Sequence, residues 1–143
     1  MVVGGFMRHL GLDLGTKTLG ISISSGIIAS NYITLRHNEE YDRIALEVKE
    51  ICLKEKINEI VLGLPKNMNN TEGFATERSL NFKKKLEDIL DIPVILEDER
   101  LTSKVANDIM ISFDTSRKKR KERVDGMASV IILQSYLDRK ERK

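Results

Sequence analysis

The 143-residue sequence predicts an α/β fold, a mixed five-stranded sheet with helices on both faces. Three strand patterns come first and are joined by short turns, so we expect these strands to pair antiparallel. Two further apolar strands alternate with amphipathic helices, which is the arrangement of parallel strands. A chain of this length supports one hydrophobic core. We expect a single domain at 7–139, an extension at 1–6 and a basic tail at 140–143.

Short patterns predict the first three strands. Apolar residues dominate 10–14, and the polar segment 15–17 then predicts a tight turn. Over 19–24, apolar residues alternate with Gly and Ser, which is typical of a half-buried strand. Ser25-Gly26 suits a hairpin turn into a third strand at 27–35.

The rest of the chain alternates helices with strands. Continuous apolar runs at 60–64, ended by Pro65, and at 93–96 predict the fourth and fifth strands. Apolar residues recur at helical spacing in four segments, 44–52, 82–90, 105–110 and 124–137. The predicted order is therefore β-β-β-α-β-α-β-α-α, with helices available for both faces of the sheet.

Composition excludes several classes of protein. With 41% hydrophobic residues, the chain is too apolar for a disordered segment. No apolar run approaches the roughly 18 residues of a membrane-spanning helix, and the only cysteine, Cys52, excludes a disulfide scaffold. The first eight residues lack the pattern of a signal peptide. We therefore expect a cytoplasmic protein with no membrane partner.

Charge is distributed unevenly along the chain. Residues 116–143 carry a formal charge of +6, and the remainder carries −4. Lys118, Lys119 and Arg120 lie in the densest basic stretch. A basic segment of this kind attracts polyanions, because each phosphate that it neutralises releases condensed counterions. The alternative is a solvated basic loop with no ligand.

Asp13 is an acid inside an otherwise apolar strand. Burying a carboxylate is costly unless it is paired, hydrogen-bonded or bound to a metal. A structural role is the simpler alternative, with the carboxylate accepting hydrogen bonds from the turn at 15–17. The position at the end of a predicted strand makes Asp13 a candidate functional residue, because sites in α/β proteins gather where strand ends meet helix ends.

A second acidic block, 97–100, follows the fifth strand. Strand alternation places Asp98 on the face of Leu96, and Glu97 and Glu99 on the other face. The sequence leaves open which face turns toward the core. Acids before a helix also favour its macrodipole, so an ordinary structural role stays open.

Asp125 is the third acid, expected in the first turn of the last helix and directly after the basic segment. Three carboxylates that converge at one edge of a sheet repel each other, and Mg²⁺ or Mn²⁺ with oxygen ligands neutralises them. Two such ions assist phosphodiester hydrolysis. His9 and His37 stand outside any such cluster and are interpreted as surface or strand-edge residues, and Cys52 as a packing residue.

Four ordered motifs resemble the blocks of the YqgF family, at residues 11–20, 61–68, 98–102 and 124–129. The family consists of RNase H-like proteins described as Holliday-junction resolvases and as nucleases that mature the precursor of small-subunit ribosomal RNA. The resemblance implies an RNase H-like fold and a metal-dependent nuclease. It implies that Asp13, Glu99 and Asp125 are catalytic metal ligands, with Asp98 as the alternative second ligand.

The resemblance also implies which substrates and partners to expect. Precursor 16S rRNA is the preferred substrate and junction DNA the second, with ribosomal particles as a candidate partner and a monomer or homodimer as the assembly. Beside Asp13, Thr16 and Lys17 offer a hydroxyl and a cation to a phosphate. Asn67 lies in a polar loop after the fourth strand, and Arg100 either clamps phosphate or pairs with a neighbouring acid.

Two other functions compete with a nuclease. The segment Asp13-Leu14-Gly15-Thr16 also resembles the first phosphate motif of actin-like ATPases and sugar kinases, which need two such lobes where 143 residues supply one. A non-catalytic RNA-binding assembly factor would keep the fold and the basic segment, although it has no need of three acids.

Overall fold

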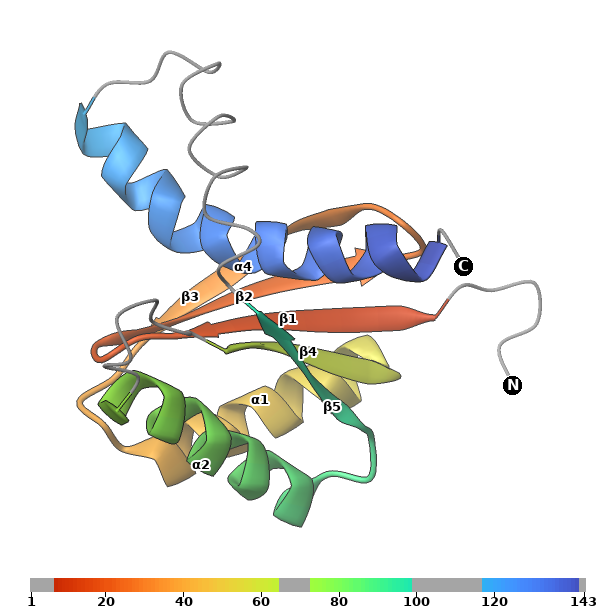
Figure 1. The fold of residues 1–143 in the computed structure, drawn as a ribbon. Coiled ribbons are helices and arrows are strands. Elements are labelled where there is room, and N and C mark those ends of the chain that lie inside the picture. Colours follow the sequence, from red (N-terminus) through yellow and green to blue (C-terminus); the bar gives the residue numbers. More distant parts are fainter. Residues whose placement is uncertain (1–6, 65–72, 99–116, 142–143) are drawn as a thin grey trace.

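The computed structural model describes residues 7–64, 73–98 and 117–141. They form one five-stranded sheet and three helices (Figure 1). The strands are β1 (Arg8–Leu14), β2 (Thr18–Ser25), β3 (Ala29–Arg36), β4 (Glu59–Leu64) and β5 (Val94–Asp98). The helices are α1 (Tyr41–Glu55), α2 (Gly73–Ile89) and α4 (Arg117–Glu141). In α4 the side chains are described from Met127 onward.

The strand order is β3-β2-β1-β4-β5. β1 pairs antiparallel with β2, and β2 with β3, as the short predicted turns require. β1 pairs parallel with β4, and β4 with β5. The predicted mixed sheet is confirmed, and the carboxyl ends of β1, β4 and β5 lie at one edge of it.

α1 and α2 cover one face of the sheet, and α4 covers the other (Figure 1). The face under α1 and α2 holds the larger apolar core. Alternation sends Leu10, Leu12 and Leu14 of β1 to this face, where they pack with Ile44 of α1 and Phe82 of α2. The periodic apolar residues of the sequence are therefore mainly the residues of this core.

The α4 face has a smaller apolar cluster, made of Val61, Ile132, Leu133 and Leu137. Here α4 approaches the sheet closely over Gly11. A Cβ atom on Gly11 would lie 2.8 Å from Leu133 Cβ and 3.0 Å from the Ser129 carbonyl oxygen. The absence of a side chain at this position is what allows the close approach.

α4 begins earlier than the sequence predicts. The apolar spacing indicates a start at Val124, but the helix already includes Arg117. Arg and Lys are good helix formers, and residues 117–123 contain no Gly or Pro to stop the helix. Asp125 is therefore in the third turn of the helix, and the expected position in its first turn is wrong.

Two further points concern the predicted elements. The helix expected at 105–110 lies outside the described residues. Among the residues that are described, no helix is long and apolar enough to cross a membrane.

Candidate active site

Asp13 is half-buried near the carboxyl end of β1, on the α4 face. His9 and Gly11, four and two residues earlier, fix this orientation. The His9 ring lies 5.9 Å from the Tyr136 ring of α4, and Gly11 lies beneath Leu133. Alternation along the strand directs Asp13 to the same side. Its partner on β2 is Gly20, which places no side chain beside it.

The direction of α4 bears on Asp125. Tyr136 lies beside His9, whereas Ser129 lies beside Gly11, so α4 runs antiparallel to β1. Asp13 is two residues beyond Gly11, about 6.6 Å along a strand, and Asp125 is four residues before Ser129, about 6 Å along a helix. The two positions are therefore displaced toward the same end of the sheet. The side chain of Asp125 is outside the described part of the chain.

The basic segment is at this end as well. Lys118, Lys119 and Arg120 lie in the first turns of α4. Figure 1 shows this N-terminal part of α4, in light blue, sloping away from the sheet at the end where β1 turns into β2. Of the other predicted ligands of nucleic acid, Asn67 and Arg100 lie outside the described residues.

The second acidic block is described as far as Asp98, the last residue of β5. Val94 and Leu96 pack into the core with α1 and α2, so Asp98 lies on that face of the sheet. Glu97 lies on the α4 face, the face of Asp13. The structure thus answers the question of orientation that the sequence left open. Glu99 itself is outside the described residues.

Sequence inspection missed the environment of Glu97, whose side chain has no exposed surface. Both terminal nitrogens of Arg139 donate to its two carboxylate oxygens, one of them at 2.7 Å. The Ser135 hydroxyl donates a third hydrogen bond at 3.0 Å. The partners lie about forty residues away in the sequence, so no local pattern could have revealed them.

The turn after Asp13 is held by His37. Its Nε2 lies 3.0 Å from the carbonyl oxygen of Gly15, which can only accept a hydrogen bond. Its Nδ1 accepts from the backbone N–H of Glu39 at 2.9 Å, so the ring is the neutral Nε2–H tautomer. Thr16 and Lys17 stay exposed on the turn. A rigid turn with an exposed hydroxyl and cation is suited to an anionic ligand.

Both histidines were expected at the surface or at strand edges, and this is wrong as to the surface. His9 is 3% exposed and His37 is 5% exposed. Burial of each ring is compensated by a hydrogen bond at its Nε2, to Glu59 for His9 and to the Gly15 carbonyl oxygen for His37, whereas Nδ1 of His9 is buried with no partner among the described residues. Cys52 is buried as predicted, and burial raises the pKa of its thiol to about 12.

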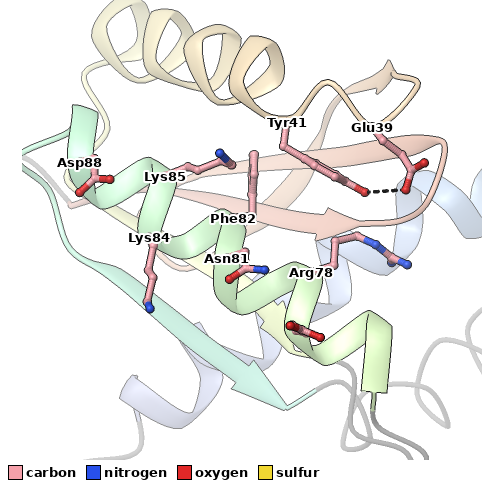
Figure 2. Close-up of a pocket in the computed structure, with 9 residues that line it drawn as sticks. Glu39, Tyr41, Arg78, Asn81, Phe82, Lys84, Lys85 and Asp88 are labelled. Carbon is pink, nitrogen blue, oxygen red and sulfur yellow. Dashed lines mark hydrogen bonds between the residues drawn. The ribbon is translucent and has the colours of Figure 1, made fainter.

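A groove of about 900 Å³ lies on the opposite face, along α2 (Figure 2). Its walls carry both signs of charge, from Arg78, Lys84 and Lys85 and from Glu39, Glu77 and Asp88. None of the predicted site residues lines it. Mixed charge gives this groove no preference for a polyanion, in contrast to the strand edge next to the basic turns of α4.

Within 7–64, 73–98 and 117–141, no three described side chains of His, Cys, Asp or Glu are grouped so that they could hold a metal. The described part of the predicted site is thus Asp13, its turn and Asp98. Its chemistry is that of carboxylate oxygen, which suits Mg²⁺ or Mn²⁺ better than softer metals.

The family model for RuvX, described as a Holliday junction resolvase, matches residues 7–139. The chain belongs to the RuvX family. RuvX is the family that the four sequence motifs resemble under the name YqgF. Membership of this family supports the function of a nuclease, which is a hydrolase of nucleic acid.

Relatives of this RuvX chain cover nearly all of it. A "Putative pre-16S rRNA nuclease" of Clostridium kluyveri (strain ATCC 8527) is 48% identical over 135 residues, which are 93% of this chain and 98% of that protein. A protein of the same name from Geobacillus sp. (strain WCH70) is 49% identical over 138 residues, 94% of this chain and 100% of that protein.

One solved structure shows the fold. T. thermophilus RuvC in complex with a Holliday junction substrate superposes with a TM-score of 0.66 at 13% identity, covering 96% of this chain and 97% of that one. The expected RNase H-like fold is confirmed by this likeness and by the mixed sheet.

Proposed function

We propose that this RuvX protein is a metal-dependent nuclease in which Asp13, Glu99 and Asp125 hold Mg²⁺ or Mn²⁺, two ions in all. The observation that carries the proposal is Asp13, a carboxylate at the carboxyl end of β1, on the face that α4 covers. Asp98 is the weaker choice for the second ligand, because it lies on the opposite face of the sheet.

Bound metal would supply charge stabilisation for a phosphodiester and would lower the pKa of a reacting water. The donor set fits, since Asp13, Glu99 and Asp125 offer only oxygen ligands. The protein's own part is to hold Asp13 and Asp125 on two regular elements, β1 and α4, with Glu99 directly after β5.

Other residues of the chain are proposed to hold the substrate. Thr16 and Lys17 would donate to a phosphate next to Asp13, from a turn fixed by His37. Lys118, Lys119 and Arg120 would contact the backbone of the nucleic acid farther along, with Asn67 and Arg100 as further donors.

Precursor 16S rRNA is the proposed substrate, in the cytoplasm and with ribosomal particles as partners. The names of relatives that cover nearly the whole length of the chain support it. Junction DNA is the second candidate, supported by the description of the family model. A non-catalytic assembly factor would bind RNA without cutting it.

One assay separates these functions. Purified protein is incubated with precursor 16S rRNA or with a four-way DNA junction, each with Mg²⁺, with Mn²⁺ and with chelator. We expect metal-dependent cleavage of the RNA, and a loss of at least about a hundredfold in Asp13→Asn, which corresponds to some 3 kcal/mol of lost transition-state stabilisation. Asp91→Asn, an exposed aspartate after α2, is the matched control and should cleave normally.

The outcomes are distinct. Equal cleavage by wild type and Asp13→Asn would point to a contaminating nuclease and would refute catalysis at Asp13. Cleavage of the junction alone would assign the second function. Binding of the RNA without cleavage under any metal would leave the assembly factor.

A second test concerns the basic turns of α4. Replacing Lys118, Lys119 and Arg120 by Ala should weaken binding to nucleic acid and flatten the dependence of log K on log salt by about one unit per lost phosphate contact. The charge-matched control replaces Lys83, Lys84 and Lys85 of α2 by Ala, and it should keep the slope. Equal slopes in both triple variants would make the α4 segment a solvated helix end.

A further inference from the structure

Glu97 is a fully buried carboxylate in the strand that leads to the second acidic block. A buried charge is costly unless hydrogen bonds and an opposite charge compensate it. Here they do. The Arg139 guanidinium engages both carboxylate oxygens, and the Ser135 hydroxyl donates a further bond at 3.0 Å. Arg139 is itself 51% exposed, so only one end of the pair is desolvated.

The cluster joins two elements of the proposed site. Glu97 is the register partner of Gly63 on β4, and it directly precedes Asp98 and Glu99. Ser135 and Arg139 belong to α4, the helix that carries Asp125. The planar, two-point contact of Arg with a carboxylate fixes orientation as well as distance.

A second tether lies on the other side of α4. The Ser22 hydroxyl of β2 donates to the Ser129 carbonyl oxygen at 2.7 Å. In the order β3-β2-β1-β4-β5, β2 and β5 flank the pair of central strands. α4 is therefore held on both sides of β1, which carries Asp13.

The Gln134 amide also bonds to the backbone of Ala29, and the Tyr136 hydroxyl to Glu59, so α4 is held to β3 and β4 as well. The Glu97 cluster is what ties α4 to β5, the strand that leads to the second acidic block.

We propose that Glu97, Ser135 and Arg139 form a positioning cluster for the nuclease site. The cluster fixes the end of β5 against α4, and hence the position of the second acidic block relative to the elements that carry Asp13 and Asp125. The inference rests on the proposed function. It assigns no substrate or metal contact to Glu97.

A buried ion pair is not by itself evidence of a stabilising role. Replacing a buried ion pair by apolar residues of similar volume is often neutral or stabilising. The double variant Glu97→Leu/Arg139→Met should thus keep the fold while it removes the two-point contact. A purely structural pair predicts wild-type catalysis in such a variant, and a positioning cluster predicts a loss.

The test measures kcat and KM for metal-dependent cleavage of precursor rRNA, together with the rise in Tm on adding Mn²⁺. For Glu97→Leu/Arg139→Met we expect an unchanged Tm without metal, a kcat at least about tenfold lower, an almost unchanged KM and a smaller Mn²⁺-induced rise in Tm. The matched control is Glu47→Leu/Arg43→Met, an exposed pair on α1 with Arg43 at 47% exposure. It should match wild type in every measurement.

Each result of this test bears on the positioning role of the cluster. Wild-type kcat and Mn²⁺ response in the folded double variant overturn the inference. If that variant does not fold, Glu97→Met/Arg139→Leu takes its place under the same criterion. Failure of both to fold assigns the pair to stability and also overturns it. An inactive wild type would count against the proposed function instead, and the Mn²⁺ response would still test the cluster.

Discussion

The two faces of the sheet are built differently. Under α1 and α2 the strands present a continuous apolar surface, with Leu10, Leu12 and Ile60 fully buried. Under α4 the buried positions include His9, Ser22 and Glu97, each with a polar partner on α4 or a neighbouring strand. The face under α1 and α2 buries most of the apolar side chains. On the face under α4, part of the contact area consists of polar contacts, which fix the positions of the groups that make them.

The difference indicates a division of labour. Apolar contacts are not directional, so the α1 and α2 face stabilises the fold without fixing any single group. Hydrogen bonds and paired charges hold groups at set distances and angles, and they cluster on the face where Asp13 lies. We therefore expect substitutions on the first face to change stability, and substitutions that displace α4 or the end of β5 on the second face to change activity.

The largest effect on stability is expected from Phe82→Ala, on the α2 side. Phe82 is 1% exposed and packs in the main core. Its loss should cost about 3–5 kcal/mol of unfolding free energy, measured by urea denaturation, because it leaves a cavity. Leu53→Ala is the control, because Leu53 of α1 is 68% exposed. Its unfolding free energy should stay within about 0.5 kcal/mol of wild type. A kcat lowered more than tenfold in folded Phe82→Ala would break the division between the faces.

Gly11→Ala, under α4, should lower stability less than Phe82→Ala does, and should lower activity more. The new Cβ would lie 2.3 Å from Ser22 Oγ and 2.8 Å from Leu133 Cβ, so α4 must shift. Overpacking of this kind costs about 1–3 kcal/mol, and the shift should lower kcat. Gly15→Ala meets nothing closer than 3.4 Å and should unfold like wild type. Normal kcat in Gly11→Ala would show that the placement of α4 does not matter for catalysis.

The smallest expected effect is a pH dependence of folding stability that comes from His9, at the end of the α4 face away from Asp13. Burial lowers the pKa of His9 below 6.5, against the opposing influence of Glu59. The unfolded chain therefore takes up a proton on acidification before the folded one does. Stability from this group is complete above pH 6.5 and falls as the pH drops toward the folded pKa, by no more than about 1.4 kcal/mol per pH unit for one proton.

His9→Gln is the variant that isolates this effect. Its unfolding free energy, followed by urea denaturation from pH 8 to pH 5, should fall less on acidification than that of wild type. Cleavage at pH 7.5 should be normal, because His9 lies at the opposite end of β1 from Asp13. Parallel pH profiles of stability in the two proteins would contradict a lowered pKa of His9.

The sequence predicts the elements of this fold well because their patterns are local. The spacing of Ile44, Val48 and Cys52 is that of a helix with one buried face, and all three are buried. The alternation of Leu19, Ile21 and Ile23 likewise matches β2, whose apolar residues face α1 and α2. Asp13 stands out because a charge in an apolar strand is costly.

The sequence fails where partners are distant. Nothing local pairs Glu97 with Arg139, or His37 with Gly15, and so both buried groups were overlooked as structural features. The start of α4 was missed because charged residues carry no apolar spacing, although Lys and Arg favour helices. The sequence could not assign Asp98 to a face of the sheet, because which face of β5 packs on the core with α1 and α2 is a tertiary property.

The most direct measurement is a crystal structure of the protein soaked in Mn²⁺, with anomalous diffraction to locate the ion. We expect Mn²⁺ between β1 and α4, with carboxylate oxygens of Asp13 and Asp125 among its ligands. Mn²⁺ bound elsewhere only, or Asp13 and Asp125 pointing to different sides of the molecule, would contradict a shared metal site at the edge of this sheet.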